Sequence, residues 1–249
     1  MTPRAPLGRV APEGLWTRID VVAETGSTNA DLVAATDATE GTVLVAESQR
    51  AGRGRLGRRW TAPPRSGLFF SVLLRPAAGA SLGWLPLLTG VAVAQAVRGS
   101  SGAEATLKWP NDVLAGDRKL GGILAERRPD GAVVIGIGLN VSLTADELPV
   151  PTATSLLLEG GTTDRDAILR AVLRELAARH ADWTNGKSMH AEYVRLCATL
   201  GRRVRVELPN APDLTGEAVD IEAGTGRLVV RTAEGVVQAV SAGDVIHVR

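Results

Sequence analysis

The chain has 249 residues, 45% of them hydrophobic and 22% charged, a composition typical of a globular protein that buries a large core. Its 28 Lys and Arg nearly balance its 27 Asp and Glu, so it lacks the overall basic excess of a protein that coats nucleic acid. The single cysteine, Cys197, excludes an internal disulfide, and three scattered histidines form no metal-ligand pattern. We interpret Cys197 as a buried, unreactive thiol.

The N-terminal region carries no signal for export. Residues 1–16 lack the apolar stretch of a signal peptide. The most apolar span, residues 84–97, is shorter than the roughly 20 residues that a bilayer requires, and Pro86 and Gly90 interrupt it. We therefore expect a cytoplasmic protein that does not bind membranes.

The first 160 residues predict a mixture of strands and helices. Residues 1–15 are expected to form a loose leader, and Ser27 is a candidate N-cap of a short helix through Val33. A buried helix is predicted at residues 85–97, and strands at residues 42–47, 68–74, 105–109, 120–126 and 133–141. Tight turns at Asp117-Arg118 and Pro129-Asp130-Gly131 join neighbouring strands. This order favours an α+β fold, with a mixed sheet backed by helices, over a doubly wound one.

The predicted elements change near Leu200, from helices to short strands. Residues 164–180 predict an amphipathic helix and residues 189–200 a second helix. Short strands follow at residues 204–208, 217–222, 228–232, 236–240 and 245–248, which indicates a small β-barrel. We therefore predict a leader (residues 1–15), a catalytic domain (residues 16–200) and a C-terminal barrel (residues 201–249).

Residues 49–60, which we call the arginine loop, contain five arginines and three glycines. Glycines let a backbone approach a ligand closely, and arginine forks bind phosphate or carboxylate oxygens. Five like charges repel one another, so we expect the loop to be mobile when empty and ordered by an anionic ligand. Taken alone, the loop is also compatible with a solvated basic segment or an RNA-binding Arg/Gly segment.

Three further motifs extend this pattern. Lys108-Trp109-Pro110-Asn111-Asp112 places a cation and two polar side chains at a turn. Lys119 precedes a Gly121-Gly122 pair inside a strand-like run, which suggests close approach of a ligand or another backbone. Gly136 and Gly138 alternate along one strand face and leave room for a planar ligand. No third glycine and helix follow them and no GxxxxGK[ST] loop occurs, so any nucleotide is bound without a P-loop or a dinucleotide fingerprint.

Taken in order, these segments resemble the motifs of the biotin–protein ligase family. The segments are Glu24-Thr25-Gly26-Ser27-Thr28-Asn29, Gly52-Arg53-Gly54-Arg55-Leu56-Gly57-Arg58, Lys108-Trp109-Pro110-Asn111-Asp112, Lys119-Leu120-Gly121-Gly122-Ile123 and Gly138-Leu139-Asn140-Val141. The resemblance runs from about residue 16 to the C-terminus and is weakest at residues 142–200. It implies a mixed-sheet catalytic domain followed by a small SH3-like β-barrel.

The resemblance also implies roles for individual residues. The catalytic residues would be Lys119, Arg53, Arg55 and Asp112. The biotin-binding residues would be Ser27, Thr28, Asn29, Gln49, Gly52, Arg53, Lys119, Gly121, Gly122 and Gly138. The ATP-binding residues would be Arg53, Arg55, Arg58, Trp60, Asn111, Lys119 and Asn140. Mg²⁺ would arrive with ATP near Asn111 or Asn140, without a ligand set supplied directly by the protein.

The implied activity is formation of biotinyl-5′-AMP from biotin and ATP, then transfer of biotin to a lysine of the biotin carboxyl carrier domain of an acyl-CoA carboxylase. Only about 20 residues precede the first motif, too few for a DNA-binding domain, so we expect the monofunctional type without DNA binding. A lipoate or octanoate ligase is the nearest alternative. An RNA-binding module is a more distant one, because five Trp, two Phe and one Tyr supply no row of stacking aromatics. The oligomeric state, the role of the barrel, and whether residues 136–141 form an internal strand or lie near a dimer edge stay open.

Overall fold

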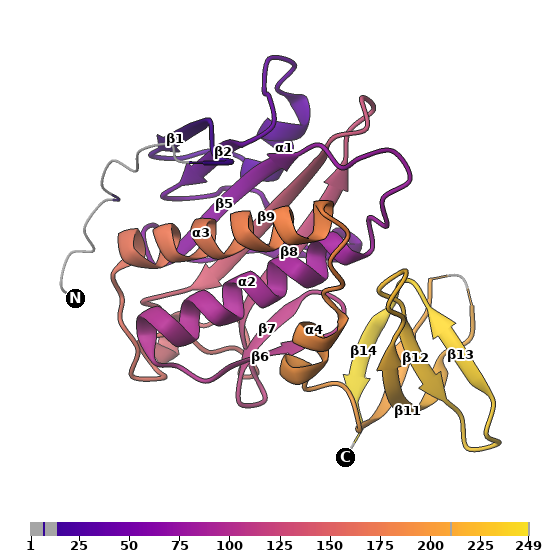
Figure 1. Ribbon diagram of the computed structural model, residues 1–249. Helices are drawn as coiled ribbons and strands as arrows, with labels where there is room; N and C mark the ends of the chain where they lie inside the picture. Colours follow the sequence, from indigo (N-terminus) through magenta and orange to yellow (C-terminus); the bar gives the residue numbers. More distant parts are fainter. Residues whose placement is uncertain (1–6, 8–13, 210, 249) are drawn as a thin grey trace.

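A seven-stranded mixed sheet forms the centre of the larger part of the molecule (Figure 1). The computed structural model describes residues 7, 14–209 and 211–248. Across the sheet the strands are β1 (Arg18–Val22), β2 (Thr42–Ala46), β5 (Gly67–Leu74), β9 (Val133–Asn140), β8 (Arg118–Arg127), β7 (Asp112–Ala115) and β6 (Ala105–Lys108). Only β1 and β2 pair in parallel among these strands, which confirms the predicted α+β class. Strand β9, with its two glycines, is internal, between β5 and β8.

Helices cover both faces of this sheet. Helices α2 (Trp84–Ser101) and α3 (Arg165–Thr184) pack on one face, where Val72 and Ile135 point into the main core. Helix α1 (Thr28–Ala34) packs on the opposite face, in a smaller cluster that contains Leu73 and Val134. Alternate residues of β5 and β9 thus face opposite ways, as the strand period requires. On the α1 face, Gly122 of β8 and Gly136 and Gly138 of β9 line a cavity.

The helix starts agree with the sequence, but three helix ends do not. Helix α2 runs to Ser101, where Gly102 in a left-handed conformation caps it, and α3 runs to Thr184, so both end four residues after the predicted positions 97 and 180. Ser27 has an extended backbone and its hydroxyl accepts a bond from Ala30 N, which confirms it as the N-cap of α1. Helix α4 (His190–Leu196) ends before the predicted residue 200. The prediction was wrong there because Ala198 N donates to Leu107 O, so the chain leaves the helix to bridge the edge strand β6. Cys197, in this bridge, is buried, and burial raises the pKa of its thiol, in agreement with an unreactive role.

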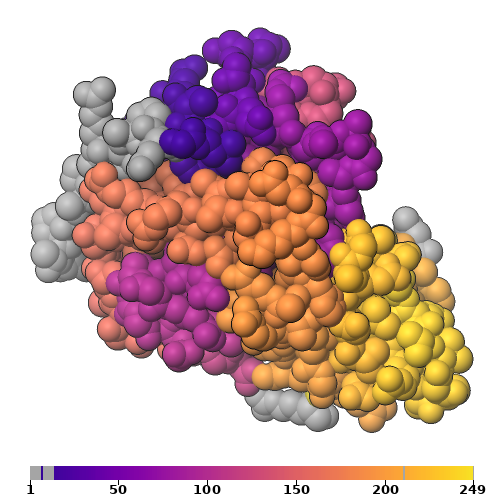
Figure 2. All heavy atoms as spheres, in the orientation of Figure 1, coloured from indigo at the N-terminus to yellow at the C-terminus, as the bar shows by residue number. Residues whose placement is uncertain are grey.

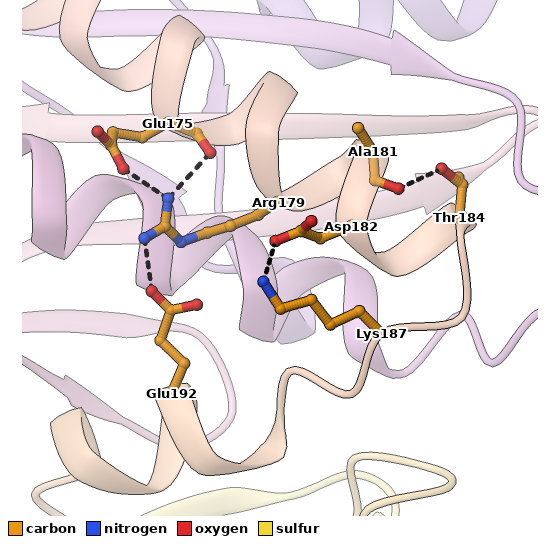
Figure 3. A network of polar contacts seen from close by, with 7 residues as sticks. All are labelled: Glu175, Arg179, Ala181, Asp182, Thr184, Lys187 and Glu192. Atoms are coloured by element: carbon orange, nitrogen blue, oxygen red, sulfur yellow. Dashed lines mark hydrogen bonds and ion pairs between the residues drawn. The ribbon is translucent and has the colours of Figure 1, made fainter.

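Helices α3 and α4 are tied together by Arg179 (Figure 3). Its guanidinium lies 2.5 Å from a carboxylate oxygen of Glu175, one turn earlier, and 2.5 Å from one of Glu192 on α4. The Arg179 side chain is only 12% exposed, so this three-residue network is largely withdrawn from water. It ties α4 to α3.

The C-terminal part is a five-stranded antiparallel sheet, as expected for the small SH3-like barrel. Its order is β13 (Val237–Val240), β12 (Leu228–Arg231), β11 (Leu214–Ile221), β10 (Arg203–Glu207) and β14 (Asp244–His247). It forms one end of the molecule and abuts the segment coloured orange (Figure 2). Two indoles attach it to the catalytic part, because Trp84 Nε1 donates to Ala223 O at 2.8 Å and Trp109 Nε1 to Gly226 O at 3.0 Å.

Most of the predicted leader lies outside the described residues, and the limits at residues 16–200 and 201–249 stay predictions. Strands β1 and β7 and the two short strands at Gly52–Arg53 and Arg59–Trp60 were not predicted, and Arg118 begins β8 rather than closing the turn. Within the described part of the chain, no helix combines the length and apolar character needed to cross a bilayer.

Candidate active site

The arginine loop folds as a small hairpin. Strand β3 (Gly52–Arg53) pairs with β4 (Arg59–Trp60), and a 3-10 turn (Arg55–Gly57) connects them. A Cβ on Gly52 would lie 2.5 Å from Trp60 O, so only glycine permits this close strand approach. Gly57 adopts φ +73°, a left-handed conformation that glycine favours. These two glycines therefore shape the hairpin itself.

Each arginine that the sequence assigns to phosphate has an internal oxygen partner. Arg53 Nη1 lies 3.4 Å from a carboxylate oxygen of Glu126, and Arg58 is ion-paired with Asp244 at the start of β14. Arg55 donates to Asn111 Oδ1 at 3.1 Å and to a barrel carbonyl at residue 243. Burial lowers the pKa of Arg55, while the charge of Asp112 opposes that shift. The loop is thus held between the catalytic sheet and the barrel.

The segment from Lys108 to Asp112 forms the turn of the β6–β7 hairpin. The Trp109–Pro110 peptide bond is cis, and Lys108 and Asp112 are paired across the two strands. Asn111 is fixed from both sides, because its Nδ2 donates to Ile123 O while its Oδ1 accepts from Arg55. Burial lowers the pKa of Lys108, and Asp112 partly offsets that effect. Asp112 is therefore a carboxylate flanked by cations.

Lys119 and Trp60 lie together above the glycines. Lys119 Nζ is 2.6 Å from Asp112 Oδ1 and 5.7 Å from the centroid of the Trp60 ring. A Cβ on Gly138 would meet Trp60 Cε2 at 2.8 Å, and one on Gly122 would meet Trp60 Cζ3 at 3.2 Å. The planar group that lies on these glycines in the structure is therefore the indole of Trp60. Side chains at either glycine position would push it away.

The opposite end of the site is polar and uncharged. Gln49 Oε1 accepts from the backbone nitrogen of Thr28 at 2.9 Å and from its hydroxyl at 3.2 Å. Ser27 lies beside them, and both Ser27 and Thr28 are 3% exposed. Hydrogen-bonding groups so deeply buried suit a ligand with matched donors and acceptors.

All five motifs meet at one cavity of about 120 Å³, lined among others by Ser27, Arg53, Asn111, Lys119 and Gly138. A larger cleft of about 1020 Å³ adjoins it, between the arginine loop, the start of α2 and the barrel turn at Thr225. The loop arginines line both spaces, whereas Gln49, Asp112 and Lys119 line only the smaller cavity. The larger cleft gives it an open approach.

Three predicted residues, Asn140, Gly121 and Gly52, do not line this cavity, and Gly52 lines the larger adjoining cleft instead. Asn140 is 4% exposed and its Nδ2 donates to Thr154 O, so it anchors the segment after β9. Gly121 lies on the other face of β8, where a Cβ would meet Gly138 O at 2.8 Å. Asn29 lines the cavity, but hydrogen bonds to Ser71, Leu124 and Glu126 engage both ends of its amide.

The sequence reading missed two charged residues of the site, Glu126 and Asp244, and gave no separate role to Lys108, which it named as the cation of its motif. Glu126 pairs with Arg53, Asp244 pairs with Arg58, and Lys108 lies near Asp112. Strand alternation carried a signal for Glu126, because it falls on the same face of β8 as Gly122 and Leu124. Asp244 had no local signal, since only the tertiary fold brings β14 to the loop.

The donor set does not fit a metal ion held by protein side chains. The Oδ1 atom of Asn111 faces the Arg55 guanidinium, and the Asp112 and Glu126 carboxylates face cations. Among the described residues, no group of three or more His, Cys, Asp or Glu is arranged to bind a metal. The chemistry derived below therefore uses the cationic side chains alone.

Comparisons with known proteins agree with this architecture. The Biotin/lipoate A/B protein ligase family matches residues 19–142, and the Biotin protein ligase C terminal domain matches residues 199–248. The chain is 46% identical to a biotin–[acetyl-CoA-carboxylase] ligase of Mycobacterium tuberculosis, over 94% of this chain and 90% of the relative. It is 34% identical to the bifunctional ligase/repressor BirA of Bacillus spizizenii, over 90% of this chain and 71% of that protein.

A solved structure gives the same result for the fold. The biotin protein ligase of Aquifex aeolicus in complex with biotin and ATP superposes with a TM-score of 0.82 at 29% identity, covering 94% of this chain and all of that one. The mixed sheet, the C-terminal unit and the cation-rich cavity together define a ligase of the biotin/lipoate class. The chain belongs to the biotin–protein ligase family.

Proposed function

We propose that the protein joins biotin and ATP to form biotinyl-5′-AMP, and then transfers the biotinyl group to a lysine of the carboxyl carrier domain of an acyl-CoA carboxylase. The observation that carries this proposal is that one cavity has a neutral polar end, at Thr28 and Gln49, and a cationic end, at Arg55 and Lys119. Biotin has a neutral ureido ring and a carboxylate tail, so one molecule matches both ends.

The ureido ring would bind at the polar end. Gln49 Oε1 already accepts from Thr28, so we assign its Nε2 and the hydroxyls of Ser27 and Thr28 to the ring. Each ureido group left without a partner would cost about 1–3 kcal/mol. Gly52, Gly122 and Gly138 would act indirectly, because they leave room for Trp60, which borders the cavity.

The first step brings two anions together. The biotin carboxylate attacks the α-phosphorus of ATP, a carboxyl oxygen–phosphorus bond forms, and the bond to pyrophosphate breaks. Arg53, Arg55 and Lys119 would stabilise the charge that develops on the phosphate, because fixed cations aimed at such charge need no reorganisation. Arg58 would bind the released phosphates, and Trp60 would pack against adenine. Mg²⁺, we propose, enters only as the complex with ATP.

The intermediate of this step is a mixed anhydride that water would hydrolyse. The arginine loop is held by the barrel at Gly243 and Asp244, and in this position it would cover the intermediate and keep water out. Exclusion of water by such a cover protects a reactive intermediate.

The second step is attack of the acceptor lysine on the carbonyl carbon, with AMP as leaving group. The amine must be neutral, so a proton has to leave it. Asp112 is placed to accept this proton or to orient the amine. Its partner Lys119 would by then contact the phosphate, which leaves the carboxylate available.

The test is exchange of labelled pyrophosphate into ATP with biotin, lipoate and octanoate in parallel. Exchange with biotin alone supports the proposal, and exchange with lipoate or octanoate alone would move the protein to the lipoate side of the family. Exchange with none of the three acids would remove the ligase proposal. RNA binding is not favoured, because the loop arginines turn toward Glu126, Asn111 and Asp244 rather than forming a stacking surface.

Other properties of the proposed enzyme stay predictions. We expect no operator-specific DNA binding, which a gel-shift assay tests. A cytoplasmic location without membrane attachment is tested by cell fractionation, and the carrier-domain partner by mass-spectrometric detection of a biotinylated lysine.

A further inference from the structure

Glu126 is a carboxylate that connects two parts of the site. It lies near the end of β8 on the α1 face, with 29% of its side chain exposed. Its Oε2 accepts from Asn29 Nδ2 at 2.8 Å, and its Oε1 lies 3.4 Å from Arg53 Nη1. One side chain therefore contacts both helix α1 and the arginine loop.

The contact with Asn29 continues into the polar end of the cavity. Asn29 Oδ1 accepts from the Ser71 hydroxyl at 2.6 Å, and that hydroxyl is hydrogen-bonded to Thr28 Oγ1 at 2.8 Å. Thr28 in turn is bonded to Gln49. A continuous chain of hydrogen bonds thus runs from the groups assigned to the biotin ring, through Asn29 and Glu126, to Arg53.

The members of this chain differ in their freedom to move. Thr28 and Asn29 are 3% exposed and Ser71 is fully buried, so they form a rigid base. The Arg53 side chain is 53% exposed, and an ion pair so open to water contributes little to stability. The ion pair instead orients the Arg53 side chain. A guanidinium has five donors in a fixed plane, so if Arg53 uses one edge for Glu126, its other edge points in a defined direction.

We propose that Glu126 is a positioning residue that couples occupancy of the polar end of the cavity to the orientation of Arg53. This inference rests on the proposed function. A ligand bound to Thr28 and Gln49 would hold these residues and Asn29 more rigidly. Glu126, bonded to Asn29, would then restrict the motion of Arg53 in the arginine loop. Such coupling is reciprocal, so a loop held by Glu126 would also favour the ligand at the other end.

The experiment measures protection of the arginine loop against trypsin, which cleaves after arginine. Cleavage after Arg55 is followed by mass spectrometry on the full-length protein, with and without biotin. Biotin should slow this cleavage in the unmodified protein. In Glu126→Gln the amide oxygen still accepts from Asn29 while the charge toward Arg53 is lost. We expect biotin-dependent protection to weaken by about fivefold and biotin affinity to fall by a similar factor, because the coupling is reciprocal.

Glu217→Gln is the matched control, because it neutralises a strand glutamate that faces Arg231 in the barrel, at 3.9 Å. It should keep full protection. Biotin should protect the arginine loop of the double variant Arg53→Gln/Glu126→Gln as well as it protects the loop of Arg53→Gln, because Glu126 acts through Arg53. Equal protection in Glu126→Gln and the unmodified protein would overturn the inference, and so would a further loss of biotin affinity when Glu126→Gln is added to Arg53→Gln.

Failure of the inference is distinguishable from failure of the proposed function. If the unmodified protein neither binds biotin nor exchanges pyrophosphate, the proposed function fails and the inference with it. If it exchanges pyrophosphate with biotin but biotin does not protect the loop, only the inference fails.

Discussion

Lys119 Nζ lies 2.6 Å from Asp112 Oδ1, so the lysine assigned to the biotin carboxylate already contacts a carboxylate of the protein itself. The two side chains are 35% and 20% exposed, and Lys108 lies opposite Asp112 across the β6–β7 hairpin. A biotin carboxylate at this place would replace one oxygen anion by another around the same ammonium group. The geometry of the site is therefore preformed, and binding exchanges partners rather than creating a new charge cluster.

Lys119→Ala removes the cation nearest to the reacting carboxylate. We expect the rate of biotin-dependent pyrophosphate exchange to fall about 100-fold, the usual effect of deleting one fixed group that stabilises transition-state charge. Lys187→Ala is the control, since Lys187 is ion-paired with Asp182 in the α3–α4 segment and should exchange at the normal rate. Equal rates in both variants would contradict the role of Lys119.

Asp112→Ala separates the two chemical steps. We expect transfer of biotin to the acceptor lysine to slow by about 100-fold or more, as for loss of a general base, and pyrophosphate exchange to slow less. Single-turnover transfer from preformed biotinyl-5′-AMP measures the second step alone. If both steps slow equally, Asp112 acts by holding Lys119 and not by handling the amine proton.

Gly138→Ala tests the close approach of Trp60 to β9. The added methyl would lie 2.8 Å from Trp60 Cε2, so the indole must move from the position assigned to adenine stacking. We expect KM for ATP to rise about tenfold, equivalent to about 1.4 kcal/mol. Gly224→Ala is the control, because a Cβ at Gly224 has no neighbour within 4 Å. In a Trp60→Ala background, Gly138→Ala should add nothing, and an additive effect would mean that the methyl acts elsewhere.

The local sequence pattern was sufficient to predict those parts of the site that depend only on residues close together in the sequence. Alternation placed Gly136 and Gly138 on one strand face, and an N-cap hydroxyl marked the start of α1 at Ser27. Both follow from rules that act within a few residues. The same is true of most strands, whose ends agree with prediction within about two residues.

What the sequence did not predict depends on tertiary contacts. Strand β1 alternates weakly and contains Arg18 and Asp20, because it is an edge strand held mainly by its backbone pairing with β2. The pairing of Arg58 with Asp244 requires the barrel to be docked first, and no local rule predicts the position of a docked domain. Asn140 was assigned to nucleotide from its motif, whereas the fold uses its amide to hold the segment at Thr154.

The environment of His247 should make the folded protein less stable in acid. Burial, with Lys108 and Arg202 nearby, lowers its pKa to about 4, against the effect of Asp117. The lower folded pKa means that the unfolded chain binds more protons between pH 6.5 and pH 4, so the stability contributed by neutral His247 is complete above pH 6.5 and is lost as pH falls toward 4. After allowance for its exposure to solvent, we expect a loss of roughly 1 kcal/mol.

Urea unfolding of His247→Gln at pH 7 and pH 4.5 checks this. The glutamine keeps a donor for Thr199 and an acceptor for Arg202, the two groups that flank the ring. The variant should lose less stability between the two pH values than the unmodified protein. Part of the slope should persist, because burial also lowers the pKa of His180. An unchanged slope would show that His247 does not contribute.

Arg179→Ala should weaken the attachment of α4 to α3. The change leaves Glu175 and Glu192 without their shared cation, and Glu192 is only 24% exposed (Figure 3). Loss of charge-assisted bonds in such a partly buried network should lower the free energy of unfolding by about 2–3 kcal/mol. The control Arg231→Ala, which removes an open pair at 3.9 Å, should change it by less than about 0.5 kcal/mol.

The network also predicts non-additivity. Glu175→Gln and Glu192→Gln each remove one partner of the same guanidinium, so a double-mutant cycle with Arg179→Ala should give a coupling free energy of about 0.5–3 kcal/mol for each pair. Additive effects would mean that Arg179 stabilises the hairpin through the apolar part of its side chain and not through the carboxylates. Biotin-dependent pyrophosphate exchange at low temperature should stay normal in all three variants, because this network lies on the α3 side of the sheet and the cavity on the α1 side.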